Sequence, residues 1–300
     1  MNTQVLSHTR FDVYRAVTDS IIASIEVGAG EFVMPWHGQG AAIAKPQNAH
    51  TRMEYHGINV LALWAQAHAK GYRSGFWGTY RQWQEVGAQV AKGAKSSTIV
   101  FFKRIEQERD ELGKEPGIRL FARASRVFNA DQVEGWTPPE ERHPPGSAEL
   151  SEAVALFVRA TKADVHWTGQ MACYHIASDH IEMPAVTRFR DTPTSPATHG
   201  FGATILHELV HWSGAKHRLN RFEHRLKLED MAAEELVAEI GSAFLCADLG
   251  LANVPRPDHA AYVAHWLQQL KNDPRAIFVA SRLASQAAMF LHELVSANEW

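Results

Sequence analysis

The chain has 300 residues, of which 45% are hydrophobic and 21% charged, and its formal net charge is −3. This composition is typical of a folded protein with one or two domains, and it excludes a disordered or low-complexity chain. The sequence has no apolar run of the roughly 18 residues that span a bilayer and no secretory signal pattern. Its two cysteines, Cys173 and Cys246, are isolated. We therefore expect a cytoplasmic protein without a membrane partner.

The charge is distributed unevenly along the chain. Residues 1–146 hold 17 Lys and Arg against 15 Asp and Glu, whereas residues 147–300 hold 13 against 18. Within residues 43–104 there are nine basic residues and only two acidic ones. This asymmetry predicts a polyanion as the partner of the first half.

Patterning predicts both helices and strands in the first half. Hydrophobic periodicity and glycine stops predict helices at 11–27, 55–72 and 78–87. Two stretches rich in β-branched and aromatic residues, 96–105 and 118–130, are predicted to pair as strands. The first half is therefore expected to be an α+β domain.

A proline-rich segment divides the chain. GWTPPEERHPPGS, residues 135–147, holds four prolines and two glycines, which block regular structure. We place a first domain at 1–138, a linker at 139–147 and a second domain at 148–300. The second domain is predicted to contain a helix at 149–163, a strand or hairpin at 172–184, a helix around residue 207, and helices at 230–249, 257–271 and 274–297. The fold class is therefore α+β with two domains.

The second domain contains the motif HELVH at residues 207–211. Residues four apart lie on one face of a helix, so His207 and His211 can point at one cation. Glu208 lies about 100° around the helix axis, where it would act as a general base on a metal-bound water. The motif predicts a metallopeptidase-type centre with Zn²⁺, or another divalent metal such as Mn²⁺. Two hydrogen-bonded core histidines would show the same spacing.

Two residues compete as the third ligand. His217 completes HELVHWSGAKH, which has metzincin spacing. Glu235 lies on a later predicted helix and would bind the metal, while Glu239, one turn further, would support a histidine from behind. A metzincin also needs a methionine turn, but the nearby Met231 lies inside a predicted helix. We therefore favour Glu235.

Aromatic residues are interleaved with the positive charges of the first half. Ten lie between residues 36 and 104. Aromatic faces stack on unpaired bases while Lys and Arg follow phosphates, so this pattern predicts binding of single strands without sequence preference. Trp64, Trp83 and Phe101 are expected in the core. The expected DNA contacts lie in or beside loop-like stretches and are Arg73, Trp77, Lys92, Lys95 and Lys103.

Five stretches between residues 54 and 281 carry motifs whose resemblance to a known family extends over nearly the whole chain: EYHGINVLALWAQAHAKGYRSGFWGTYRQWQEVGAQVAKGAK, FNADQVEG, LHELVHWSGAKHRLNR, EELVAEIGSAFL and AYVAHWLQQLKNDPRAIFVAS. In this order they resemble the ArdC family of plasmid antirestriction proteins, and the N-terminal part is also similar to plasmid conjugation primases. The resemblance implies an N-terminal single-stranded DNA-binding domain and a C-terminal zincin-like metallopeptidase domain. It implies site roles for His207, Glu208 and His211, matches Glu235 to the family's acidic ligand, and disfavours His217.

The resemblance also implies that the protein protects conjugatively transferred DNA from host restriction. The expected partners are single-stranded DNA and a component of the host restriction system that the metal site would cleave. Two alternatives stay open at this point. The protein could coat DNA while its metal is structural or regulatory, or it could be a metallopeptidase whose first domain binds protein.

Overall fold

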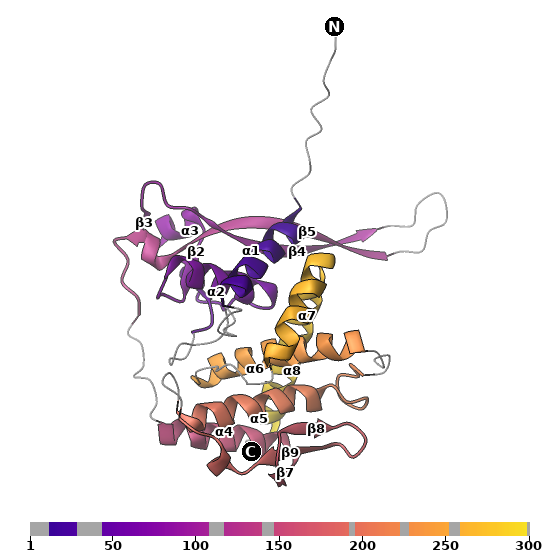
Figure 1. The fold of residues 1–300 in the computed structure, drawn as a ribbon. Coiled ribbons are helices and arrows are strands. Elements are labelled where there is room, and N and C mark those ends of the chain that lie inside the picture. The colour runs from indigo at the N-terminus through magenta and orange to yellow at the C-terminus, as the bar shows by residue number, and fades with distance from the viewer. Residues whose placement is uncertain are drawn as a thin grey trace, which may run out of the picture.

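The computed structural model describes residues 12–28, 44–107, 117–139, 147–191, 196–222, 228–251 and 259–298. Both halves combine helices with sheets, so the expected α+β class is confirmed. Figure 1 shows the N-terminal half above the C-terminal half, with α7 (His259–Asn272) rising towards α1 (Val13–Gly28). In these ranges every helix is too short or too polar to cross a membrane.

The N-terminal half is built around a four-stranded sheet in the order β1-β2-β5-β4. Its strands are β1 (Gln47–Asn48), β2 (Phe76–Gly78), β4 (Ser97–Gln107) and β5 (Gly117–Asn129). The other elements are α2 (Ile58–Lys70), α3 (Tyr80–Glu85), β3 (Gln89–Val90), the 3₁₀ turn Ala130–Gln132 and β6 (Val133–Glu134). Helix α2 ends where Gly71 adopts a left-handed conformation, with φ 68°. Helix α3 begins with a capping box between Thr79 and Gln82.

Strands β4 and β5 form a long antiparallel hairpin that runs across the top of Figure 1. Only Phe128 and Asn129 of β5 pair with β2, so most of the hairpin is a two-stranded ribbon. Neighbouring elements do not cover both faces of such a ribbon. Phe101 is consequently 53% exposed, and its expected place in the core is wrong.

Trp77 corrects a second expectation, because its side chain is only 1% exposed. It lies in β2, in the middle of the sheet, and its ring packs edge-on against Tyr72 with 5.9 Å between centroids. Trp64 and Trp83 are buried as expected. A buried indole cannot stack on a base, so Trp77 is removed from the expected DNA contacts.

The C-terminal half layers helices on a small sheet. Its helices are α4 (Ser147–Thr161), α5 (Ala197–Ser213), α6 (Leu228–Leu249), α7 and α8 (Ala276–Asn298). The sheet has the order β7-β9-β8, and its strands are β7 (Asp164–Gly169), β8 (Cys173–His175) and β9 (His180–Pro184). Strands β8 and β9 are the expected hairpin, and a 3₁₀ turn follows at Val186–Arg188. Helix α5 lies between this sheet and α6 (Figure 1).

The two halves share one hydrophobic core, which runs from α1 and α2 into α8. The rings of Tyr14 and Phe278 lie 4.7 Å apart between centroids, and Thr18 donates a hydrogen bond to the carbonyl of Pro274. Lys45 and Asp248 form an ion pair of 2.6 Å between the halves. Residues 140–146 of the expected linker lie outside the described residues. The domain boundaries therefore stay a prediction.

Candidate metal centre

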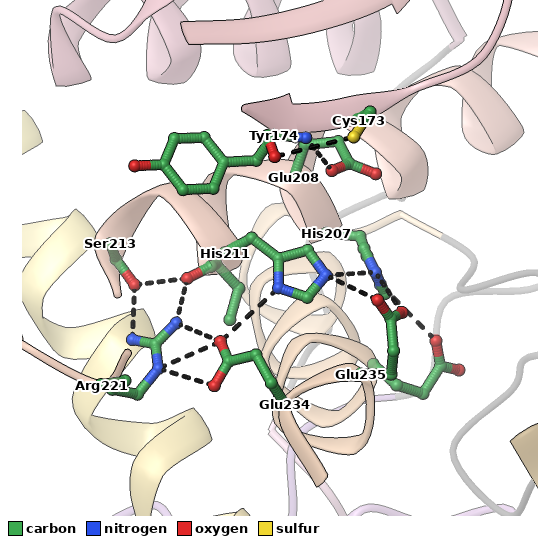
Figure 2. A network of polar contacts seen from close by, with 11 residues as sticks. Cys173, Tyr174, His207, Glu208, His211, Ser213, Arg221, Glu234 and Glu235 are labelled. Carbon is green, nitrogen blue, oxygen red and sulfur yellow. Dashed lines mark hydrogen bonds and ion pairs between the residues drawn. The ribbon is translucent and has the colours of Figure 1, made fainter. Parts of the chain in front are cut away.

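The three favoured ligands come together between α5 and α6 (Figure 2). The Nε2 atoms of His207 and His211 lie 3.1 Å apart, and each lies 3.4 Å from an oxygen of Glu235. Tetrahedral Zn²⁺ with bonds of 2.0–2.1 Å sets its ligand atoms about 3.3 Å apart. Two imidazoles and a carboxylate at these separations fit a divalent cation.

Close packing of the two helices brings these ligands together. The apolar residues of α5 that flank the histidines are fully buried: Ile205, Leu206, Leu209 and Val210. Opposite them, Gly241 of α6 sits so close that a β-carbon there would lie 2.8 Å from Cγ2 of Val210. A glycine at this position therefore allows α6 to approach α5.

Two further carboxylates lie behind the histidines. Oε2 of Glu239 is 3.9 Å from Nδ1 of His207, and Oε1 of Glu234 is 3.5 Å from Nδ1 of His211. Glu239 thus lies where the sequence placed it, beside a histidine. Glu234 is not among the site residues predicted from the sequence, yet its side chain is buried. The sequence carried a signal for this burial, because an acidic side chain in an apolar helix is energetically costly unless it has an ionic or hydrogen-bonded partner.

That partner is Arg221, which follows α5. Its guanidinium lies 2.8 Å from Oε1 of Glu234 and donates hydrogen bonds to Oγ of Ser213 and the carbonyl of Val210 (Figure 2). Arg221 therefore ties the end of α5 to α6. By holding Glu234, it also fixes the group beside His211.

The carboxylates control the charge of the centre. Burial disfavours the charged imidazolium of His211, but the adjacent Glu234 and Glu235 outweigh this effect and raise its pKa to about 10. Burial alone would raise the pKa of Glu235, yet hydrogen bonds from His207 and His211 leave it well below its ordinary value. An ionised Glu235 is the form that binds a cation.

Glu208 flanks this group without joining it, as the motif predicts. Its carboxylate is almost completely buried, and Oε2 accepts a hydrogen bond of 2.9 Å from the backbone N–H of Tyr174. Tyr174 belongs to β8, an edge strand of the sheet. The edge strand therefore holds the carboxylate in place next to the histidines.

His217 lies in a different network. Its side chain is 64% exposed, and Nε2 is 3.2 Å from Oδ2 of Asp179. Arg218 binds the same aspartate and the hydroxyl of Tyr174, and its guanidinium stacks 3.8 Å above the ring of Trp212. Burial, followed by the bond to Asp179, raises the pKa of Tyr174 to about 12. Within the described ranges, the one group of side chains whose geometry could hold a metal ion contains Glu235 and not His217.

The structure describes the side chains of only some of the residues expected to contact DNA. Arg73, Lys92 and Lys95 are exposed, whereas the side chain of Lys103 lies outside the described residues. A cation–aromatic cluster was not predicted: the guanidinium of the exposed Arg52 lies 5.4 Å from the ring centroid of Phe76 and 5.9 Å from that of Trp136, and both rings are partly buried. These three residues are distant in the sequence, so no local pattern indicated the cluster.

Each half of the chain matches the model of a known protein family. Residues 11–128 match the model of the N-terminal domain of the anti-restriction factor ArdC, and residues 152–283 match that of a zincin-like metallopeptidase. The antirestriction ArdC protein from plasmid R388 is 39% identical. Its metal-free crystal structure gives a TM-score of 0.79 and covers 97% of this chain and 100% of that one. Its Mn(II)-bound structure gives 0.75. The chain belongs to the ArdC family.

Other relatives of this ArdC-family protein differ in length. It is 44% identical to the uncharacterized protein y4eC of Sinorhizobium fredii, over 97% of this chain and 95% of the relative. It is 32% identical to the DNA primase TraC of Escherichia coli, over 93% of this chain but only 27% of the primase. The chain thus matches about a quarter of that primase.

Proposed function

We propose that the chain is an antirestriction protein that binds single-stranded DNA with its N-terminal half and carries a metal-dependent peptidase site in its C-terminal half. It would act in the cytoplasm and protect conjugatively transferred DNA from host restriction. The observation that carries the proposal is the convergence of His207, His211 and Glu235, with Glu208 beside them. The family relationship joins this site to antirestriction.

The metal half uses its residues in distinct roles. His207, His211 and Glu235 would hold Zn²⁺ or Mn²⁺, and the R388 relative contains Mn(II) in one of its structures. When bound, the cation supplies a water of lowered pKa and polarises the carbonyl of the scissile peptide bond. The Glu208 carboxylate takes the proton from the attacking water and delivers it to the leaving amine. The N–H of Tyr174 orients that carboxylate, and Glu234 and Glu239 orient the two imidazoles.

The DNA half offers positive charge and partly exposed aromatic rings. Arg73, Lys92 and Lys95 would follow phosphates, while Phe76 and Trp136, with Arg52 above them, offer ring faces for bases. Such contacts bind single strands with little sequence preference. Their affinity falls as salt rises, because counterions are released on binding.

The first test is fluorescence anisotropy of a labelled single-stranded oligonucleotide with the full chain, at two salt concentrations and against duplex. The full chain is used because the halves share a core. We expect salt-dependent binding that prefers the single strand and weakens when Lys92 and Lys95 are both changed to Gln. Changing Arg188 and Arg190, two exposed arginines of the other half, is the matched control. Salt-insensitive binding, or none, would remove the DNA part of the proposal.

The second test is protection of a conjugating plasmid in a restricting host. Glu208→Gln removes the base and keeps the size of the side chain. We expect protection to fall to the level of a strain without the protein, while the variant stays folded and binds DNA as before. Full protection by this variant would instead favour a DNA-coating protein with a structural or regulatory metal.

A further inference from the structure

A cavity lies at the junction of the two halves, and none of its lining residues is one of the proposed metal ligands. It has a volume of about 520 Å³, and its walls come from α1, α2 and β4 on one side and α8 on the other. This size falls within the usual range for small-molecule sites. Tyr14, Phe102 and Phe278 form its aromatic wall, and the rings of Phe102 and Phe278 are perpendicular, with centroids 6.3 Å apart. Phe102 is 45% exposed and therefore accessible at the mouth.

The charge of this cavity is one-sided. Arg275 and Arg282 line it, and none of the described lining residues is acidic. The guanidinium of Arg275 lies 5.1 Å from the ring centroid of Tyr14, and Arg282 donates a hydrogen bond to Gln286. Among the described residues neither arginine has an ion pair with a carboxylate. An aromatic wall beside two such cations complements a planar base that is joined to an anionic phosphate.

We propose that this junction cavity binds one nucleotide unit of single-stranded DNA, with the base against Phe102 and the phosphate on Arg275 and Arg282. The inference rests on the proposed function and extends it, because it makes α8 of the C-terminal half a part of the DNA site. The bound strand would then contact both halves at once.

The cavity lies along the chain from the exposed lysines Lys92 and Lys95, which favours a DNA strand over a free nucleotide as its occupant. Lys92 and Lys95 come directly before β4, and β4 leads to Val100 and Phe102 in the cavity wall. From Ser97 to Phe102 the strand rises about 17 Å. A DNA strand that follows this path covers the distance in a few nucleotides and reaches the cavity with one base.

The chain offers a matched pair of aromatic variants. Phe101 and Phe102 are neighbours in β4, both are exposed, and consecutive side chains of a strand point to opposite faces. In anisotropy titrations with the full chain and labelled oligo-dT, we expect Phe102→Ala to weaken binding about fivefold or more. Phe101→Ala should leave it within twofold. The reverse pattern would place the DNA on the other face of the hairpin and overturn the proposal.

The phosphate contact has its own measurement. We expect Arg282→Gln to lower the slope of log affinity against log salt by about 0.7, the value for one phosphate contact to a single strand. Arg188→Gln, which removes an equal charge elsewhere in the C-terminal half, should leave the slope unchanged. Free thymidine monophosphate should not displace the oligonucleotide at equal nucleotide concentration. Displacement would identify a free-nucleotide site and overturn the strand assignment.

A cross-link locates the base directly in the unmodified chain. Oligonucleotides with 5-iododeoxyuridine should cross-link to peptides that contain residues 98–102 or 275–289. Cross-links confined to residues 73–95, which do not line the cavity, would overturn the cavity assignment while leaving single-strand binding intact. If the wild-type chain binds no single strand at all, the proposed function itself fails.

Discussion

The guanidinium of Arg221 lies 2.8 Å from the carboxylate of Glu234, and their side chains are only 3% and 7% exposed. This pair joins the segment after α5 to α6, the two elements that supply the metal ligands. Glu234 also lies 3.5 Å from Nδ1 of His211, so one carboxylate serves both the fold and the site. Burial alone would raise the pKa of Glu234, but the bond to His211 and the charge of Arg221 hold it below its ordinary value.

Removal of Arg221 should therefore be costly. Arg221→Ala leaves the carboxylate of Glu234 buried without its main cation, and loss of one partner of a buried pair costs about 3–5 kcal/mol. We expect a decrease of this size in the free energy of unfolding, measured with urea. The double variant Arg221→Met with Glu234→Gln should recover part of it, because neither charge then remains. A loss below about 1 kcal/mol for Arg221→Ala would contradict a stabilising role.

The sequence was informative about the site wherever the chemistry is local. The i, i+4 spacing of His207 and His211 fixes their common face, and the acids of an apolar helix pointed to Glu235 and Glu239. The partner of Glu234 could not be assigned, because Arg221 lies 13 residues away in a segment without regular structure. Contacts of this kind depend on packing and not on periodicity.

The same dependence on packing explains why the burial of Trp77 and the exposure of Phe101 were not predicted. Trp77 lies in a glycine-rich stretch that reads as a loop, but that stretch pairs with β1 and β5 and is covered on both faces. Phe101 lies in a strand that reads as core, but its part of the hairpin is paired only with β5. Burial of a strand residue is decided by its neighbours in space, which the local sequence does not specify.

Glu239 should affect metal affinity without being a ligand. It lies 3.9 Å from Nδ1 of His207, and loss of such an outer carboxylate typically weakens metal binding 10- to 100-fold. We expect this decrease for Glu239→Gln in Zn²⁺ titrations by calorimetry, and a larger one for Glu235→Gln. Glu293→Gln, at an exposed position of α8, is the control and should bind as the wild type does. Equal affinity of the Glu239 variant and this control would refute the orienting role.

His217→Ala separates the two possible ligand sets. The imidazole of His217 is paired with Asp179 outside the metal-binding set, so its removal should leave Zn²⁺ affinity within about threefold of the wild type. His211→Ala removes a ligand and should lower affinity by orders of magnitude in the same titration. Similar losses in the two variants would restore the metzincin spacing and displace Glu235 as the third ligand.

Asp248 should make the contact between the halves sensitive to acid. Its oxygens lie 2.6 Å from Nζ of Lys45 and 3.0 Å from Nε2 of His292. Burial raises the pKa of this carboxyl, but His292 and Lys45 lower it more, so its net pKa is below the ordinary 3.8. The unfolded chain then takes up this proton more readily than the folded one. The stabilising contribution is therefore present above pH 3.8 and is lost as the pH falls through the lower, folded pKa.

Thermal unfolding of Asp248→Asn against the wild type tests this dependence. We expect the variant to melt several degrees lower at pH 7, and the difference to shrink as the pH falls below 3.8. Asp19→Asn, on the exposed surface of α1, is the control and should show a small difference that varies little with pH. A gap between Asp248→Asn and the wild type that stays constant down to pH 2.5 would mean that the ionised carboxylate does not stabilise the junction. The halves would then be held together by their shared apolar core and by their other polar contacts, such as the hydrogen bond from Thr18 to Pro274.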